Sequence, residues 1–190
     1  DTTGTNVEIL DLANPAAPAK RWSARISGSL VSSRRIGDRI YLITRFTPYV
    51  PGYIRYASTD AQRTANAALL AATPVEALLP QVSVNGGAAM PSVAPESVHA
   101  PQLGGNVAVA DLVVVTAIDV REARIVDSLA IAGRTDALYV SPSNIYVASL
   151  RYDYSYNGGA DFGTRPAPPL YNTDIHQVGI GADRLAFPHE

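Results

Sequence analysis

The stretch from Asp153 to Asp161 carries residue types that could bind a metal ion. It reads Asp-Tyr-Ser-Tyr-Asn-Gly-Gly-Ala-Asp, with oxygen-bearing side chains at the first, third, fifth and ninth positions of a calcium loop and glycine at the sixth. The candidate calcium ligands are Asp153, Ser155, Asn157 and Asp161. The last position of such a loop normally supplies a bidentate carboxylate, but here it is Thr164, so calcium affinity should be low. The favoured alternative is a surface loop that needs no ion.

Residues that could carry out catalysis are sparse. The histidines are His99, His176 and His189, and their spacing is not that of a metal site. Ser32 and Ser33 have no histidine near them in the sequence to act as a base, and no serine occupies a G-x-S-x-G turn. The sequence therefore assigns no catalytic residue.

Tyrosine is concentrated in two segments of the chain. The first contains Tyr49, Tyr53 and Tyr56, and the second contains Tyr152, Tyr154, Tyr156 and Tyr171. Tyrosine provides a large contact area with little loss of conformational freedom, which suits recognition surfaces. The candidate ligand-binding residues are Tyr49, Tyr53, Tyr152, Tyr154 and Tyr156. The alternative is that these rings only cover neighbouring strands and a helix.

The composition excludes several classes of partner. The 190-residue chain has a formal net charge of -2, and its positive charge is scattered arginine with Lys20 as the single lysine, so nucleic acid is not expected. The absence of cysteine excludes disulfides and cysteine-ligated zinc. No apolar run is long enough to span a membrane.

The elements that position these residues follow a repeated pattern of strand pairs and hairpins. The predicted strand pairs are 7–12 with 20–26, 113–120 with 124–131, and 175–180 with 184–187; the predicted hairpins are 29–44 and 137–149. The two hairpins are about 105 residues apart, and removing roughly 60 anomalous residues between them leaves about 45, the period of a four-stranded propeller blade.

The anomalous residues form an insertion over about 47–106, between the second and third strands of one repeat. An Ala-rich stretch within it predicts a helix over about 60–70, preceded by a serine and a threonine that could cap it. We expect Leu69 and Leu70 of this helix to contact the sheet. Glycine and proline indicate that most of the remaining insertion is loop. A second insertion is predicted at 152–172, in the same place in the next repeat.

The stretch 27–44 resembles part of a family of secreted bacterial and archaeal proteins with a C-terminal β-propeller domain distantly related to WD40 repeats. In that family a Ser-Arg-x-Ile-Gly-Asp turn precedes an aliphatic strand, and a variable helical insertion closes in Leu-Pro. Residues 33–38 and 78–80 match these features, and 114–120 and 139–148 match later strands, so the resemblance covers most of the chain. It implies a propeller fold and a secreted, periplasmic or cell-surface location, and it brings no catalytic residues.

We therefore expect a mainly β fold: a partial β-propeller of about two to three four-stranded antiparallel blades with a short helical insertion, in one domain over 1–190. The expected function is a non-catalytic binding or scaffold module of an exported protein, which recognises protein or glycan through the tyrosine-rich insertions. The alternative is a propeller-based enzyme whose active site is completed by blades outside this chain. Because strand 175–180 falls in an incomplete blade and has no lysine or proline, we also expect self-association through exposed strand edges.

Overall fold

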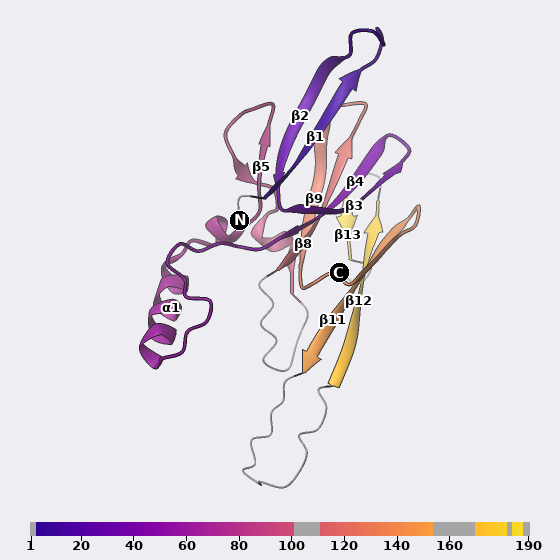
Figure 1. Ribbon diagram of the computed structural model, residues 1–190. Coiled ribbons are helices and arrows are strands. Elements are labelled where there is room, and N and C mark those ends of the chain that lie inside the picture. Colours follow the sequence, from indigo (N-terminus) through magenta and orange to yellow (C-terminus); the bar gives the residue numbers. More distant parts are fainter. Residues whose placement is uncertain (1–2, 101–110, 154–169, 182–183, 188–190) are drawn as a thin grey trace.

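The protein forms three β-sheets, with its helices in the insertion (Figure 1). The computed structural model describes residues 3–100, 111–153, 170–181 and 184–187. One sheet, the central sheet, has apolar side chains of both its faces in hydrophobic clusters, one shared with the first sheet and one with the third. The expectation of a mainly β protein built from sheets of about four strands is confirmed.

The first sheet combines an N-terminal hairpin with two strands of the insertion. Its strands, in order across the sheet, are β1 (Gly4–Asp11), β2 (Ala19–Ser27), β5 (Gln81–Val84) and β6 (Met90–Pro91), all antiparallel. In β2 the side chains of Trp22, Ala24 and Ile26 are buried, whereas that of Arg25 is exposed. This alternation is typical of a strand with one face in the core.

The central sheet contains the strand pair and hairpin of one full repeat. Its order is β3 (Ser29–Ile36), β4 (Arg39–Phe46), β8 (Leu112–Asp119), β9 (Arg124–Ala132) and β7 (Val98–His99), antiparallel except for β7, which runs parallel to β9. Gly37, with φ of 59°, is the first residue of the two-residue turn between β3 and β4, and glycine adopts this left-handed conformation without strain. The predicted antiparallel pairing of 113–120 with 124–131 is confirmed.

The third sheet follows the same order of strands. It consists of β10 (Ala137–Val140), β11 (Asn144–Asp153), β12 (Leu170–Ile180) and β13 (Leu185–Ala186), all antiparallel. The predicted hairpin is confirmed, since Ala137 pairs with Ala148 and Val140 with Ile145. The predicted start and end of the second insertion are wrong, because residues 152–153 and 170–172 are paired strand.

The core lies on both faces of β8, whose residues Leu112–Ile118 are all buried. Toward the third sheet, Val113 and Val115 share a cluster with Ile145, Val147 and Val178. On the opposite face, side chains of the central sheet meet the apolar face of β2. A strand buried on both faces lacks the polar alternation of a surface strand, which explains the continuous valine run in β8.

The insertion is more than a helix and loops, which corrects the sequence-based expectation. Strands β5 and β6 extend the first sheet beyond β2, and β7 extends the central sheet beyond β9. Val82 of β5 is 5% exposed and belongs to the same hydrophobic cluster as Trp22. Strands of four and two residues are too short to show a periodic pattern, so their positions depend on the free edges of β2 and β9.

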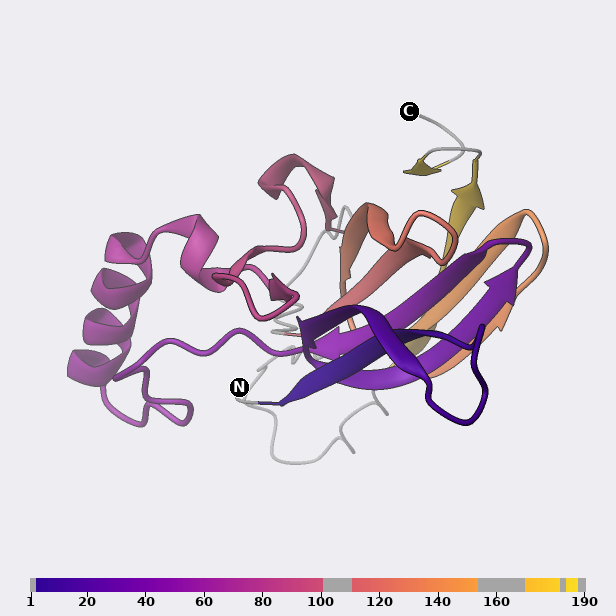
Figure 2. The ribbon, with the colours of Figure 1, turned by 90° about the horizontal axis from the view of Figure 1, so that it is seen from above.

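The predicted helix is present as α1 (Asp60–Ala72), followed by α2 (Val75–Leu78) and the 3-10 helix η1 (Pro95–Ser97). The expectation that Leu69 and Leu70 pack on a sheet is wrong. Figures 1 and 2 show α1 to one side of the three sheets, and Leu70 is 42% exposed. An alanine-rich helix has too few large apolar side chains to bury a face against a sheet.

Candidate functional site

Residues 48–57, here called the aromatic loop, connect β4 toward α1 and expose several aromatic rings. Tyr49 is 67% exposed, Tyr53 44% and Tyr56 85%, and Ile54 is also exposed. All three tyrosines therefore present much of their surface to solvent. Exposed tyrosine side chains offer flat apolar area together with a hydrogen-bonding hydroxyl.

A tight turn shapes the middle of the aromatic loop. The backbone N–H of Tyr53 donates to the carbonyl oxygen of Val50 at 3.1 Å. Pro51 and Gly52 are the two central residues, and Gly52 has φ of 83°. This combination is typical of a type II turn, in which proline presets the first central position and glycine accepts the left-handed second one.

Asn66 of α1 fixes the loop just after this turn. Its Oδ1 accepts a hydrogen bond from the backbone N–H of Ile54 at 2.9 Å, and its Nδ2 donates to the carbonyl oxygen of Ile54 at 2.8 Å. Asn66 is the buried residue of α1, with 8% of its surface exposed. The side-chain amide thus pairs with both polar groups of one residue, much as a neighbouring backbone would. Sequence reasoning missed Asn66, although a weak helix former inside an alanine-rich helix was the available signal.

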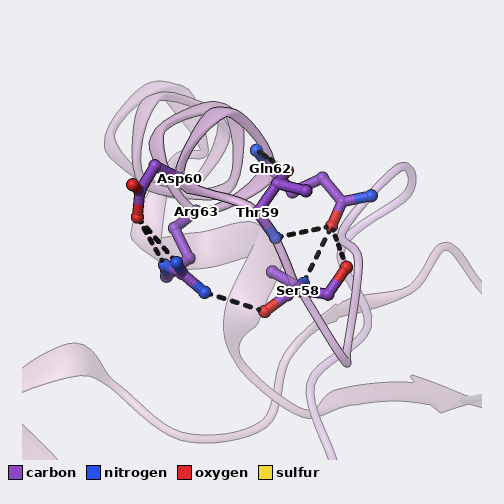
Figure 3. A network of polar contacts seen from close by, with 6 residues as sticks. Ser58, Thr59, Asp60, Gln62 and Arg63 are labelled. Carbon is purple, nitrogen blue, oxygen red and sulfur yellow. Dashed lines mark hydrogen bonds and ion pairs between the residues drawn. The ribbon is translucent and has the colours of Figure 1, made fainter.

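The end of the loop is fixed by the N-terminus of α1 (Figure 3). Thr59 is the N-cap, and its Oγ1 accepts a hydrogen bond from the backbone N–H of Gln62 at 3.2 Å. The Oε1 of Gln62 accepts in return from the backbone N–H groups of Ser58 at 2.8 Å and Thr59 at 3.2 Å. This reciprocal capping box satisfies N–H groups that have no partner within the helix.

Arg63 adds a further link between helix and loop. Its Nη1 donates to the carbonyl oxygen of Ala57 at 3.2 Å, and its Nη2 lies 2.6 Å from Oδ1 of Asp60 (Figure 3). Two residues before Ala57, the guanidinium carbon of Arg55 lies 6.0 Å from the centre of the Tyr56 ring, within range of a cation–π contact. The exposed surface of the loop therefore combines aromatic rings with a cation.

A polar cleft of about 210 Å³ lies where β7, β9 and β13 meet. Sequence reasoning missed it because its walls come from distant segments of the chain. Asp127 holds these elements together: its Oδ1 accepts from the backbone N–H of Ser128 at 2.8 Å and its Oδ2 from that of Leu185 at 2.7 Å. The rings of His99 and Phe187 lie 4.2 Å apart on the same side. These contacts join strands of the central and third sheets.

The serine in this cleft is held by the sheet itself. The Oγ of Ser128 donates to Oγ1 of Thr116 on the neighbouring strand at 3.3 Å, and the pair is buried. Both carboxylate oxygens of Asp127 accept backbone hydrogen bonds. The cleft thus brings serine, histidine and aspartate types together, but Ser128 and Asp127 are engaged in structural contacts.

His176 lies on β12 opposite Val147, whose side chain packs in the cluster between the third and central sheets. Burial lowers the pKa of His176, and the negative charge of Asp174 opposes this shift only in part. Its Nε2 is buried without a hydrogen-bond partner. The neutral imidazole is therefore the form this environment favours. Ser32 and Ser33 lie on β3 of the central sheet, whereas His176 lies on β12 of the third sheet.

The predicted residues of the second tyrosine segment fall mainly outside the described part of the chain. Tyr152 and Asp153 end β11, where their backbones pair with β12. The other candidates, Tyr154, Ser155, Tyr156, Asn157 and Asp161, lie outside the described residues. Within the described residues there is no group of three or more His, Asp or Glu side chains placed to hold a metal ion.

Comparison with known proteins defines the class of this molecule. The family model described as "Beta propeller domain" matches residues 1–188, and the chain belongs to this family. Sheets of about four strands each, packed face to face, are the architecture expected for it. No match to the chain was found among curated proteins or among solved structures. In the part of the chain that the structure describes, no helix is long and apolar enough to cross a membrane.

Proposed function

We propose that this β-propeller chain is a non-catalytic binding module of an exported protein, and that it recognises protein or glycan through its tyrosine-rich insertions. The observation that carries the proposal is the aromatic loop, whose exposed tyrosines are supported by a hydrogen-bonded backbone. Protein and glycan surfaces share the chemistry that such a loop suits: flat apolar area surrounded by hydrogen-bonding groups.

Preorganisation supports this assignment. Binding by a loose loop loses conformational entropy when the loop becomes ordered, and this loss reduces affinity. Here the turn at Gly52, the side chain of Asn66 and the capping box fix the loop before any ligand arrives. The loop also lies beside α1, away from the stacked sheets, so a large partner can approach it (Figure 2).

The proposed location outside the cytoplasm rests on sequence resemblance. Residues 27–44 resemble the secreted bacterial and archaeal proteins whose C-terminal β-propeller domain is distantly related to WD40 repeats. Fractionation of cells that express the natural gene tests this point: the protein should be found in the medium, the periplasm or at the cell surface. Recovery in the cytoplasm alone would contradict it.

The binding function is tested by replacing loop tyrosines and screening on glycan arrays and on arrays of extracellular proteins. We expect Tyr49→Ser, Tyr53→Ser and Tyr56→Ser each to weaken binding of the ligand found by about tenfold or more, because aromatic anchors commonly contribute over 1 kcal/mol. Tyr139→Ser is the matched control, since Tyr139 is also exposed, at 65%, but lies on β10.

Two results would count against the proposal. One is full binding by the triple tyrosine variant, and the other is an equal loss in the Tyr139→Ser control. The same substitutions at Tyr152, Tyr154 and Tyr156 test whether the second tyrosine segment belongs to the binding surface. The array that responds, glycan or protein, identifies the class of ligand.

A further inference from the structure

The aromatic loop contains a single charged residue, Arg55, which lies between two of the exposed tyrosines. It follows Tyr53 by two residues and directly precedes Tyr56, and all three side chains are exposed. None of the residues 48–57 is acidic. The loop therefore presents a positive charge beside flat apolar rings, and a ligand that matches it combines apolar area with negative charge.

The guanidinium group of Arg55 is available to an anionic ligand. Among the residues that the structure describes, no carboxylate lies within ion-pair distance of it. The nearest acidic residue along the chain, Asp60, is bound by Arg63, whose Nη2 and Nε lie 2.6 and 3.3 Å from its Oδ1. Arg55 lies over the Tyr56 ring at 6.0 Å, and a guanidinium over a ring contacts it with its flat face. Its N–H groups point outward in the plane of the group, where they can donate to an anion.

Two hydrogen-bonded anchors flank this arginine–tyrosine pair in the chain. On one side, the side chain of Asn66 bonds both backbone polar groups of Ile54, at 2.9 and 2.8 Å. On the other side, Nη1 of Arg63 donates to the carbonyl oxygen of Ala57 at 3.2 Å (Figure 3). The backbone is therefore held at both ends of the pair, so a ligand that binds there orders little further chain.

The size of the exposed aromatic surface favours a glycan over a folded protein. The exposed parts of Tyr49, Tyr53 and Tyr56 together equal roughly two complete side chains, or about 400 Å², since an aromatic side chain has about 150–250 Å². Each partner of a standard protein–protein interface contributes about 800 Å². A ligand of a few sugar rings needs less area, and the C–H faces of sugar rings are apolar and flat enough to pack on aromatic rings.

The charge of Arg55 narrows the class of glycan. A neutral glycan would leave the guanidinium without a partner, whereas a uronic acid carries a carboxylate on a sugar ring. Guanidinium and carboxylate groups form a bidentate pair that is stronger than a neutral hydrogen bond. We propose, resting on the binding function proposed above for the same loop, that the aromatic loop binds a glycan that contains uronic acids. The sugar rings pack on Tyr53 and Tyr56, and a carboxylate pairs with Arg55.

The test is isothermal titration calorimetry of the full chain with matched pairs of oligosaccharides. The probes are oligosaccharides of polygalacturonate, alginate and hyaluronan, each compared with its own carboxyl-reduced, neutral form. At least one acidic probe should bind, and its neutral form should bind about fivefold or more weakly, because the exposed charge pair is lost. Raising the salt concentration from about 50 to about 500 mM should narrow this difference, because ions screen exposed charges.

Substitution of Arg55 separates the charge from the rings. Arg55→Gln should weaken binding of the acidic probe about fivefold or more, to the level of the neutral form, and leave the neutral form unaffected. Arg55→Lys should be intermediate, because an ammonium group keeps the charge but cannot form the bidentate pair. Arg34→Gln is the matched control, since Arg34 is an exposed arginine on β3 of the central sheet, and it should bind like the wild type. Both arginines are exposed, so these variants should fold, as circular dichroism can verify.

Three results would overturn the proposed ligand class. They are binding to none of the acidic probes, equal binding of acidic and neutral forms, and a preference for the acidic form that Arg55→Gln leaves intact or that Arg34→Gln removes equally. If the tyrosine variants still lose a neutral glycan or a protein while Arg55→Gln binds it normally, the uronic-acid class is wrong and the binding function stands. If the tyrosine variants keep full binding of every ligand found, the binding function itself fails.

Discussion

Asn66 shows how a single buried side chain can fix the conformation of an exposed loop. Its side-chain amide bonds both backbone polar groups of Ile54, and Tyr53 and Tyr56 on either side of Ile54 are exposed. The nearby turn at Gly52 and the capping box at Thr59 act on the same segment from its two ends. Each of these contacts is local, and together they hold a loop that lies outside the hydrophobic core.

Replacing this residue should loosen the loop without unfolding the protein. In Asn66→Ala we expect the backbone amide of Ile54 to lose most of its protection from hydrogen exchange, because its acceptor is gone. The melting temperature should change by less than about 2 °C, since α1 is outside the main hydrophobic clusters. Asn66→Asp keeps the acceptor and should be intermediate, and Thr64→Ala, on an exposed position of α1, should have no effect. Unchanged protection of the Ile54 amide in Asn66→Ala would show that the hydrogen bonds of Asn66 are not needed to hold the loop.

At the scale of secondary-structure elements, the insertion performs two different roles. Its first half forms the aromatic loop and α1, which stand apart from the sheets (Figure 1). Its second half returns to the sheets, where β5 and β6 continue the first sheet and β7 continues the central one. Strand edges that would otherwise be open are covered in this way. The insertion is therefore part of the fold and not only an appended loop.

Substitution in β5 tests this conclusion. Val82→Ala should lower the free energy of unfolding by about 1.5–3 kcal/mol, because it removes two buried methyl groups from the cluster around Trp22. Val75→Ala in α2 is the control with the same chemical change, and at 49% exposure it should cost less than about 0.5 kcal/mol. Urea unfolding curves measure both. Equal, small effects would mean that β5 contributes little to the first sheet.

For the whole molecule, the central sheet connects the other two. Tyr41, Val113 and Val115 pack toward the third sheet, and Leu42 and Ile118 pack toward the first. Neighbouring residues of the same strands thus belong to different clusters. Unfolding of the third sheet would expose one face of the central sheet and weaken the strands that support the first sheet. We expect the three sheets to unfold as one cooperative unit.

Trp22 provides a direct measure of this coupling, because it is the only tryptophan and is buried in the first sheet. Val147→Ala, in the third sheet, should lower the free energy of unfolding by about 1.5–3 kcal/mol. The urea midpoint that Trp22 fluorescence reports should therefore move to a lower concentration. Circular dichroism should give the same midpoint. A Trp22 transition that stays at its wild-type position while circular dichroism moves would show that the sheets unfold independently.

The sequence by itself determined the parts of this protein that depend on local patterns. Short apolar runs separated by turn residues predicted the hairpin at 137–149 and the pairing of 113–120 with 124–131. The alanine-rich stretch and the capping residues before 60 predicted α1. These signals lie within a few residues of the elements they specify, so they could be read without knowing the rest of the chain.

Only the tertiary structure decided the features that join distant segments. β5, β6 and β7 are too short to show a period, and they exist as strands because the edges of β2 and β9 accept their hydrogen bonds. The exposure of Tyr49, the burial of Asn66 and the uncovered position of Ile175 likewise depend on where whole elements pack. Ile175 and Val115 occupy corresponding positions of the repeat, yet one is exposed and the other is buried. Their difference comes from the neighbouring sheet, which covers Val115 and leaves Ile175 open.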